Sequence, residues 1–291
     1  MEKILVSGQS GQLGQELSVI ANAYKNYKFT FLSRAELDLS MEENIRSVLE
    51  DSDFDYFINA GAYTAVDAAE DDASDAYAIN GMALFHIANY LPKKCHLIHI
   101  STDYVYNPEE ATPITESQDC NPQSIYAKSK KQGEEFVTSM LSSYTIIRTS
   151  WVYSSFGKNF LKTMQRLGND KDQLSIVSDQ IGTPTYARNI ARTIMAFIIK
   201  KERKSDKKSI TGIYNYSDDG VSNWADFARM IMDKSGLTCY IQEITTKQYN
   251  AKAPRPLYSV LSKEKIKSNL GITIPTWQES LQECLDHMIS N

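Results

Sequence analysis

The chain of 291 residues has an ordinary composition for a folded protein, with 42% hydrophobic residues, 23% charged residues and a net charge of −5. This length allows a large core and more than one domain. The acidic balance disfavours a nucleic-acid partner, and no apolar run approaches the length of a membrane span. Residues 1–7 predict a short strand rather than a signal sequence, so a cytoplasmic protein is the simplest expectation.

The four cysteines follow no spacing typical of a metal site or of a disulfide framework. His96 and His99 are three residues apart in a predicted strand, so their side chains should point to opposite faces. We therefore expect reduced cysteines and no structural metal.

Predicted strands and helices alternate along the first half of the chain. Apolar runs predict strands at residues 4–6, 27–32, 56–60, 97–100 and 144–148. Helices are predicted at 13–24, behind a capping box at 40–43, along a long segment up to about residue 90, and at 126–140. The first turns of the long helix hold Asp67, Glu70, Asp71 and Asp72, which we expect to form a solvated face. The alternation predicts an α/β fold with a doubly wound parallel sheet.

Three glycines, Gly8, Gly11 and Gly14, follow the first strand and open a helix. Gly8 would permit a tight turn, Gly11 would leave room for a pyrophosphate, and Gly14 would allow close packing of helix and strand. Free N–H groups at the start of the helix would bind the phosphates. This pattern predicts a dinucleotide site at the carboxyl ends of the strands, where residues 61–64 and 101–103 also fall.

Beyond residue 150 the alternation loosens. Helices are expected at 189–200, 223–232 and 277–289, a strand at 212–216, and a solvated charged loop at 200–208. We predict a dinucleotide-binding domain at 1–150. Residues 151–291 should form mainly a smaller α+β substrate-binding domain, with segments near 175–200 and 210–235 returning to the first domain.

The end of the second strand bears on the choice of coenzyme. A hydroxyl at Ser33 and a guanidinium at Arg34 suit a ribose 2′-phosphate better than a free 2′-hydroxyl. NADPH is therefore the expected coenzyme, with NADH also possible. The alternative is that Arg34 is only a surface residue.

Tyr126 and Lys130 lie four residues apart in a predicted helix and should share one face. A nearby ammonium would lower the pKa of the phenol from about 10, so that Tyr126 could protonate a carbonyl oxygen as hydride reaches its carbon. Thr102 would hold the same oxygen, with Ser101 as its rival, since adjacent strand residues face opposite sides. Alternatively, Thr102 only bonds to backbone at the strand end.

The glycine spacing and the Tyr/Lys pair resemble the extended branch of the short-chain dehydrogenase/reductase superfamily. Further segments, in order over almost the whole chain, are similar to dTDP-4-dehydrorhamnose reductases. They are residues 59–70, Ser101-Thr102-Asp103-Tyr104-Val105-Tyr106, residues 126–134, Arg148-Thr149-Ser150-Trp151-Val152-Tyr153, Gly157-x-Asn159-Phe160, Asp179-Gln180-x-Gly182-x-Pro184-Thr185 and Arg255-Pro256-x-x-Ser259-x-Leu261.

The resemblance implies reduction of the 4-keto group of dTDP-4-dehydro-L-rhamnose to dTDP-L-rhamnose. It implies a catalytic trio of Thr102, Tyr126 and Lys130, with Lys130 also holding the nicotinamide ribose. The implied coenzyme residues are Gly8, Ser10, Gly11, Gln12, Leu13, Gly14, Ser33, Arg34, Asp38, Leu39, Ala60, Gly61, Ala62, Tyr63, Tyr126 and Lys130. The implied sugar residues are Thr102, Asp103, Tyr106, Trp151 and Asn159.

Some relatives form a metal-bridged dimer through glutamates. Glu16 matches one of these, but residues 186–188 offer no carboxylate where another is expected, which argues against the metal and against that dimer. We therefore expect no metal, and a homodimer without one stays open. Alternative interpretations are a reductase or epimerase of another nucleotide sugar and a non-catalytic nucleotide-binding regulatory subunit. Trp151 could also be a core aromatic at a domain junction.

Overall fold

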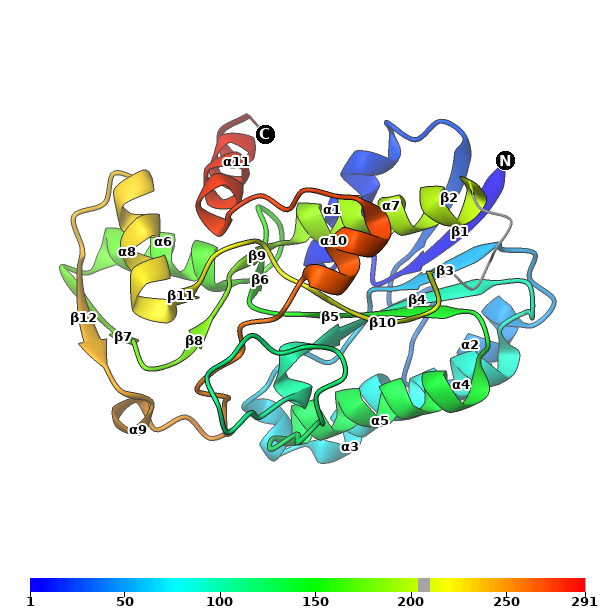
Figure 1. The fold of residues 1–291 in the computed structure, drawn as a ribbon, viewed down its shortest axis with the longest axis horizontal. Coiled ribbons are helices and arrows are strands. Elements are labelled where there is room, and N and C mark those ends of the chain that lie inside the picture. Colours follow the sequence, from blue (N-terminus) through cyan, green and yellow to red (C-terminus); the bar gives the residue numbers. More distant parts are fainter. Residues whose placement is uncertain (204–209, 291) are drawn as a thin grey trace.

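The computed structural model describes residues 1–203 and 210–290 (Figure 1). Within these residues, six parallel strands form the central sheet in the order β10-β5-β4-β3-β1-β2. The strands are β1 (Glu2–Ser7), β2 (Tyr27–Leu32), β3 (Tyr56–Asn59), β4 (His96–Thr102), β5 (Tyr144–Thr149) and β10 (Gly212–Tyr216). The predicted doubly wound parallel sheet is confirmed. Its strand order reverses between β1 and β3, where such sheets bind ligands.

Helices cover both faces of the sheet (Figure 1). One face carries α1 (Gln12–Ala21), α7 (Ala187–Arg203) and α10 (Glu264–Leu270), and the other carries α2 (Glu42–Leu49), α4 (Ala83–Tyr90) and α5 (Ile125–Met140). Ile4 and Val6 of β1 pack toward the first group, whereas Leu5 packs toward the second. Because both faces are covered, β1 reads as a continuous apolar run.

A second hydrophobic cluster lies beside the sheet, at the left in Figure 1. It is built by α6 (Phe160–Asp170), α8 (Trp224–Lys234), α11 (Trp277–Ser290) and the parallel pair β7 (Gln173–Val177) and β12 (Tyr240–Ile244). Of the segments expected to return to the first domain, α7 and β10 pack with the sheet, whereas α8 packs in the second cluster through Phe227 and Ile231. The domain division itself stays a prediction.

Several short elements complete the fold. They are β6 (Val152–Tyr153) paired with β9 (Thr185–Tyr186), β8 (Ile181–Gly182) paired with β11 (Ser222–Asn223), η3 (Asp103–Val105) and α9 (Thr246–Tyr249). Asn223 caps α8, since its side chain accepts a hydrogen bond from the N–H of Asp226.

The long helix predicted before residue 90 is broken. It consists of η1 (Ala68–Glu70), α3 (Ala73–Tyr77), a π-helical turn η2 (Ala78–Met82) and α4. Such turns are common at functional sites. The apolar spacing predicted a helical segment correctly, but it carries no information about a change of helix type.

The acidic run is largely solvent-exposed, as expected, since the Asp67 and Asp71 side chains are 47% and 71% exposed, but its members also make specific contacts. Asp67 pairs with Arg255 and Asp71 pairs with Lys252, while Glu70 accepts the N–H of Ile125 at the start of α5. These contacts tie the start of the segment to a distant part of the chain.

Two further expectations are corrected. Ser40 does not cap α2; its N–H and hydroxyl both donate to Asp38, and Met41 occupies the N-cap position without a side-chain bond. The charged tract begins as helix, because α7 continues to Arg203; its remaining residues, 204–208, lie outside the described residues.

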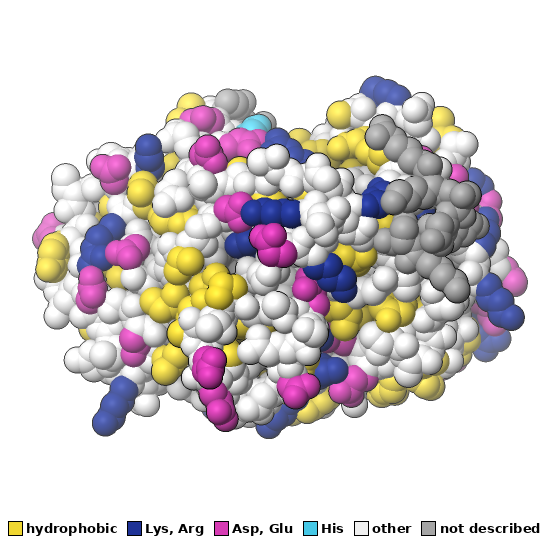
Figure 2. Space-filling model, viewed as in Figure 1, with side chains coloured by type: hydrophobic (Ala, Val, Ile, Leu, Met, Phe, Trp, Pro, Cys, Tyr) yellow, Lys and Arg dark blue, Asp and Glu magenta, His cyan; other side chains and the backbone are white. Residues whose placement is uncertain are grey.

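Acidic and basic side chains are interspersed over the face shown in Figure 2. Among the described residues, no helix combines the length and the apolar character needed to cross a membrane.

Candidate active site

A cavity of about 750 Å³ lies at the carboxyl ends of the central strands and reaches the second cluster. Its volume is typical of a site for a small ligand or cofactor. The lining combines the glycine loop after β1, the ends of β3 and β4, the start of α5, and residues from the far side such as Trp151, Asn159 and Trp224. One cavity therefore brings together groups from most of the chain.

The glycine loop has the geometry that the sequence predicts. Gly8 has a φ of +73°, and a Cβ atom there would lie 2.7 Å from the backbone nitrogen of Gly61. A Cβ atom on Gly14 would lie 2.2 Å from the carbonyl oxygen of Gly8. Gly11 is the N-cap of α1, and no side chain caps this helix. The loop thus forms a backbone cradle at a helix N-terminus, which suits a phosphate.

The predicted coenzyme residues divide into two groups. Those that line the cavity are Gly8, Ser10, Gly11, Gln12, Leu13, Arg34, Asp38, Leu39, Ala60, Gly61, Ala62, Tyr126 and Lys130. Gly14, Ser33 and Tyr63 are not among the lining residues. Gly14 supports the loop from behind, as its contact with Gly8 shows.

Arg34 and Ser33 differ in whether their side chains are available to bind an anion. The Arg34 side chain is 73% exposed, and its Nε lies 3.5 Å from Oδ2 of Asp38. The N–H and hydroxyl of Ser33 both donate to Glu36 at 2.8 Å. Arg34 is therefore free to turn toward an anion, whereas the hydroxyl of Ser33 is already engaged.

Thr102, Tyr126 and Lys130 all line the cavity, as does Ser101. Thr102 ends β4; its hydroxyl donates to Oδ1 of Asp103 and accepts the N–H of Tyr104, both at 3.2 Å. Tyr126 and Lys130 lie on the first two turns of α5.

The ammonium of Lys130 is held by two groups of β4. Its Nζ atom donates to the carbonyl oxygen of Ile100 at 2.7 Å and lies 3.2 Å from Nε2 of the buried His99. Burial lowers the pKa of Lys130 to about 8.

The expected direction of the Tyr126 pKa shift is wrong for this arrangement. Burial raises the pKa of Tyr126 to about 12, although hydrogen bonding with Thr102 acts in the opposite direction. Desolvation prevails because Lys130 points its ammonium at Ile100 and His99. Tyr126 therefore carries its proton at neutral pH.

Asp103 is a second buried acid in the cavity, 1% exposed. Burial raises its pKa to about 7, while hydrogen bonding with Thr102 acts in the opposite direction. Its carboxyl group can thus be neutral or charged near physiological pH.

Of the predicted sugar residues, Thr102, Asp103, Trp151 and Asn159 line the cavity. Tyr106 does not, and this expectation is corrected. The Tyr106 hydroxyl donates to Asn215 and accepts from Arg148, whose guanidinium pairs with Glu134. Tyr106 is 1% exposed and belongs to this buried network, which lies outside the cavity lining.

Sequence reasoning missed Asn80. Its Oδ1 accepts the N–H of Tyr63 at 2.9 Å, and its Nδ2 donates to the Tyr63 carbonyl and the Ser129 hydroxyl. Asn80 therefore fixes the loop after β3 against α5. The glycine at position 133 is a sequence feature that could have indicated this contact. A Cβ atom there would lie 2.2 Å from the carbonyl oxygen of Asn80, so α5 and η2 touch at this point.

Glu16 is engaged within the chain. Its carboxylate accepts from the Ser154 hydroxyl at 2.6 Å and from Nε of Arg188 at 2.7 Å. Among residues 1–203 and 210–290, no group of three or more His, Cys, Asp or Glu side chains could hold a metal ion.

Comparisons with known proteins agree on one family. A family model described as the RmlD substrate binding domain matches residues 1–290. The spore coat polysaccharide biosynthesis protein SpsK of Bacillus subtilis is 37% identical over 291 residues, which are 100% of this chain and 99% of that protein. The dTDP-4-dehydrorhamnose reductase of Sinorhizobium fredii is 35% identical over 285 residues, 96% of this chain and 95% of that protein.

Among solved structures, the dTDP-4-dehydrorhamnose reductase of Bacillus anthracis, in complex with NADP, is similar with a TM-score of 0.92 and 31% identity. The match covers 98% of this chain and 99% of that one. Because the family model and these relatives span nearly the whole chain, the protein belongs to the RmlD family, together with the dTDP-4-dehydrorhamnose reductases that its motifs resemble.

Proposed function

We propose that the protein reduces the 4-keto group of dTDP-4-dehydro-L-rhamnose to dTDP-L-rhamnose with NADPH, NADH being a possible substitute. One observation carries the proposal: the glycine cradle and the trio of Thr102, Tyr126 and Lys130 line the same cavity. The reductases among its relatives, and the NADP in the Bacillus anthracis structure, support the choice of reaction and coenzyme.

The coenzyme, when bound, would supply the hydride. The cradle between Gly8 and Gly61 and the uncapped start of α1 would hold its pyrophosphate. Arg34 would pair with the 2′-phosphate, and Asp38, Leu39 and residues 60–62 would line the adenosine half. Lys130 would donate to the nicotinamide ribose.

Tyr126 would supply the proton. As C4 of the sugar gains hydride, its oxygen gains the phenolic proton of Tyr126 and becomes a hydroxyl group. Tyr126 keeps its proton at neutral pH, so the phenol is present in the form that can donate. The Thr102 hydroxyl, fixed by the N–H of Tyr104, would turn its own proton from Asp103 to the substrate oxygen.

The sugar would lie between these groups and the second cluster. Asp103 and Trp151 would contact it. Asn159 caps α6 and donates to Gln12 and to the Ser154 carbonyl, so we assign it mainly to shaping the wall of the pocket. In this arrangement residues 1–150 hold the coenzyme and most of the remaining chain holds the nucleotide sugar.

The test is to incubate the protein with NADPH and dTDP-4-dehydro-L-rhamnose, follow the loss of NADPH absorbance, and identify the product by NMR. Formation of dTDP-L-rhamnose supports the proposal. Turnover only with other 4-keto nucleotide sugars would replace the substrate, and NADPH binding without turnover of any of them would favour a regulatory subunit.

A further inference from the structure

Two tryptophans from distant parts of the chain stack against each other at the cavity. The rings of Trp151 and Trp224 have centroids 3.8 Å apart and planes inclined by 13°. Both residues line the main cavity, and Trp224 also lines an adjoining apolar cavity of about 410 Å³. The proposed function uses Trp151 and leaves Trp224 unassigned.

The backbone of Trp151 has a left-handed conformation. Its φ is +44°, which is rare for a bulky residue and persists only where the surroundings determine it. The orientation of the Trp151 indole therefore depends on the groups that touch it.

Gly182 closes the space around the Trp151 indole. A Cβ atom at this position would lie 2.7 Å from Cε2 and Cζ2 of Trp151. Any side chain at residue 182 would thus displace the indole, so the glycine and the Trp224 ring together fix its position.

Trp224 is itself held in place. Its Nε1 donates to Oε1 of Gln180 at 3.1 Å, and Nε2 of Gln180 donates to the Thr246 hydroxyl at 3.0 Å. The Thr246 hydroxyl donates in turn to Asp179 at 2.7 Å. The segment Asp179-Gln180-x-Gly182, noted in the sequence, therefore supports both tryptophans.

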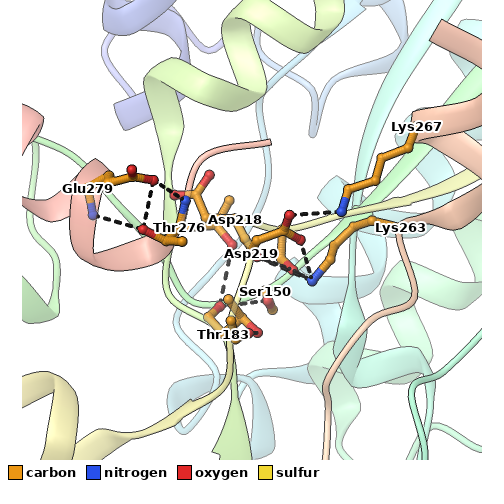
Figure 3. Close-up of polar contacts among 11 residues, drawn as sticks. Ser150, Thr183, Asp218, Asp219, Lys263, Lys267, Thr276 and Glu279 are labelled. Carbon is orange, nitrogen blue, oxygen red and sulfur yellow. Dashed lines mark hydrogen bonds and ion pairs between the residues drawn. The ribbon is translucent and has the colours of Figure 1, made fainter. Parts of the chain in front are cut away.

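The backbone beside Trp151 and beside Gly182 is tied as well, through Ser150 and Thr183, which Figure 3 labels. The hydroxyl of Ser150, directly before Trp151, donates to the carbonyl of Thr183 at 2.8 Å. The hydroxyl of Thr183, directly after Gly182, donates to the carbonyl of Gly220 at 2.8 Å. Neither chain segment can shift without breaking these bonds.

We propose that Trp224 is a positioning residue for the nucleotide sugar: with Gln180 and Gly182 it holds the Trp151 indole in the orientation that contacts the substrate. The inference rests on the proposed function for the identity of that substrate. Trp224 itself acts through Trp151, and its loss leaves the coenzyme cradle intact, since that cradle is built from β1, α1 and the loop after β3.

The first experiment needs no substrate. Stacked indoles couple electronically and give a paired band in the circular dichroism spectrum. The chain has three tryptophans, and the third, Trp277, is buried against Phe227 in the second cluster. The paired band should be present in the wild type, vanish in Trp224→Phe, weaken in Gly182→Ala, and remain in the matched control Trp277→Phe. A wild type without the band, or a band that survives in Trp224→Phe, overturns the arrangement.

The second experiment separates sugar from coenzyme. Trp224→Leu should raise KM for dTDP-4-dehydro-L-rhamnose about tenfold and change KM for NADPH by less than about twofold, because one stacking partner is lost at the sugar side. Trp224→Phe should recover most of the loss, since an aromatic ring can still stack. Gln180→Leu, which removes the hydrogen bonds to the indole and to the Thr246 hydroxyl but leaves both tryptophans in place, should act in the same direction if Trp224→Leu does not fold.

The positioning role would be contradicted if Trp224→Leu and Gln180→Leu left KM for the sugar unchanged. It would also be contradicted if each variant, including Trp224→Phe, raised KM for the sugar and KM for NADPH equally. Should the wild type fail to turn over this sugar, the proposed function fails. The circular dichroism of Gly182→Ala and Trp224→Phe then still decides whether the stack exists as described.

Discussion

The Nζ atom of Lys130 lies 3.2 Å from Nε2 of His99, a histidine that is completely buried beneath the cavity. Burial holds the pKa of His99 well below its usual value, so the ring is neutral, and Nε2 accepts from Lys130 in the tautomer that carries its proton on Nδ1. Together with the Ile100 carbonyl, His99 fixes the amine before any ligand arrives.

Replacing His99 should therefore impair catalysis. His99→Leu removes a hydrogen bond to a charged group, worth about 1.5–3 kcal/mol, so kcat/KM should fall by about tenfold or more. Steady-state kinetics with NADPH and the keto sugar check this.

His96 provides the matched control, since it is equally buried and binds the hydroxyls of Ser143 and Thr145 instead. His96→Leu should lower stability and leave kcat/KM of the folded protein close to the wild-type value. Equal losses of activity in the two variants would show that the contact with Lys130 has no special role.

Coenzyme binding should weaken with increasing pH. Because the pKa of Lys130 is lowered to about 8, its side chain is charged below that pH and neutral above it. The Kd for NADPH, measured by fluorescence titration, should rise as pH increases through about 8. Lys130→Met should bind more weakly at low pH and lack this transition; a transition of the same size in the variant would assign it to another group.

Asp103 should make stability depend on pH. Its pKa is raised from 3.8 to about 7 in the folded protein, so the folded state binds more protons than the unfolded state between these values. Stability is therefore lost as pH rises toward 7. Asp103→Asn removes this dependence. Its free energy of unfolding relative to the wild type should therefore increase by a few kcal/mol, of order 1.4 per pKa unit, as pH rises from about 4 to about 8. Urea unfolding of both proteins at about pH 4 and about pH 8 measures this. The same difference in the free energy of unfolding between variant and wild type at the two pH values would contradict a raised pKa for the buried Asp103.

Arg34 should discriminate between the coenzymes. Arg34→Ala should raise KM for NADPH about tenfold, because the 2′-phosphate loses its charged partner, and leave KM for NADH nearly unchanged. Arg46→Ala is a suitable control, since Arg46 is also exposed but pairs with Glu50 outside the cavity. Equal effects on the two coenzymes would remove the phosphate-binding role.

The parallel sheet and the glycine cradle could be predicted because their determinants are local: apolar runs, helical spacing and a fixed glycine pattern. The partners of Asp67 and Asp71 could not, since they lie 188 and 181 residues away. Two further predictions made from local sequence failed because they took no account of burial. The same Tyr126 that the spacing placed beside Lys130 has a raised pKa, and Tyr106, which the motif placed in the pocket, is part of a buried network with Arg148.

Trp224 and Asn80 were missed for a related reason. Each lies in a segment that local patterns predict only as helix, and its importance comes from what another segment places against it. The stack with Trp151 and the contacts with Tyr63 exist only once the chain has folded.

Turnover by Tyr126→Phe tests the central claim most directly. The variant keeps the ring and loses the hydroxyl, so NADPH should bind as in the wild type while kcat for dTDP-4-dehydro-L-rhamnose falls at least about a hundredfold. Tyr106→Phe, which removes a buried hydroxyl outside the cavity, should retain turnover in its folded form. Near-normal kcat in Tyr126→Phe would contradict the assignment of Tyr126 as the proton donor.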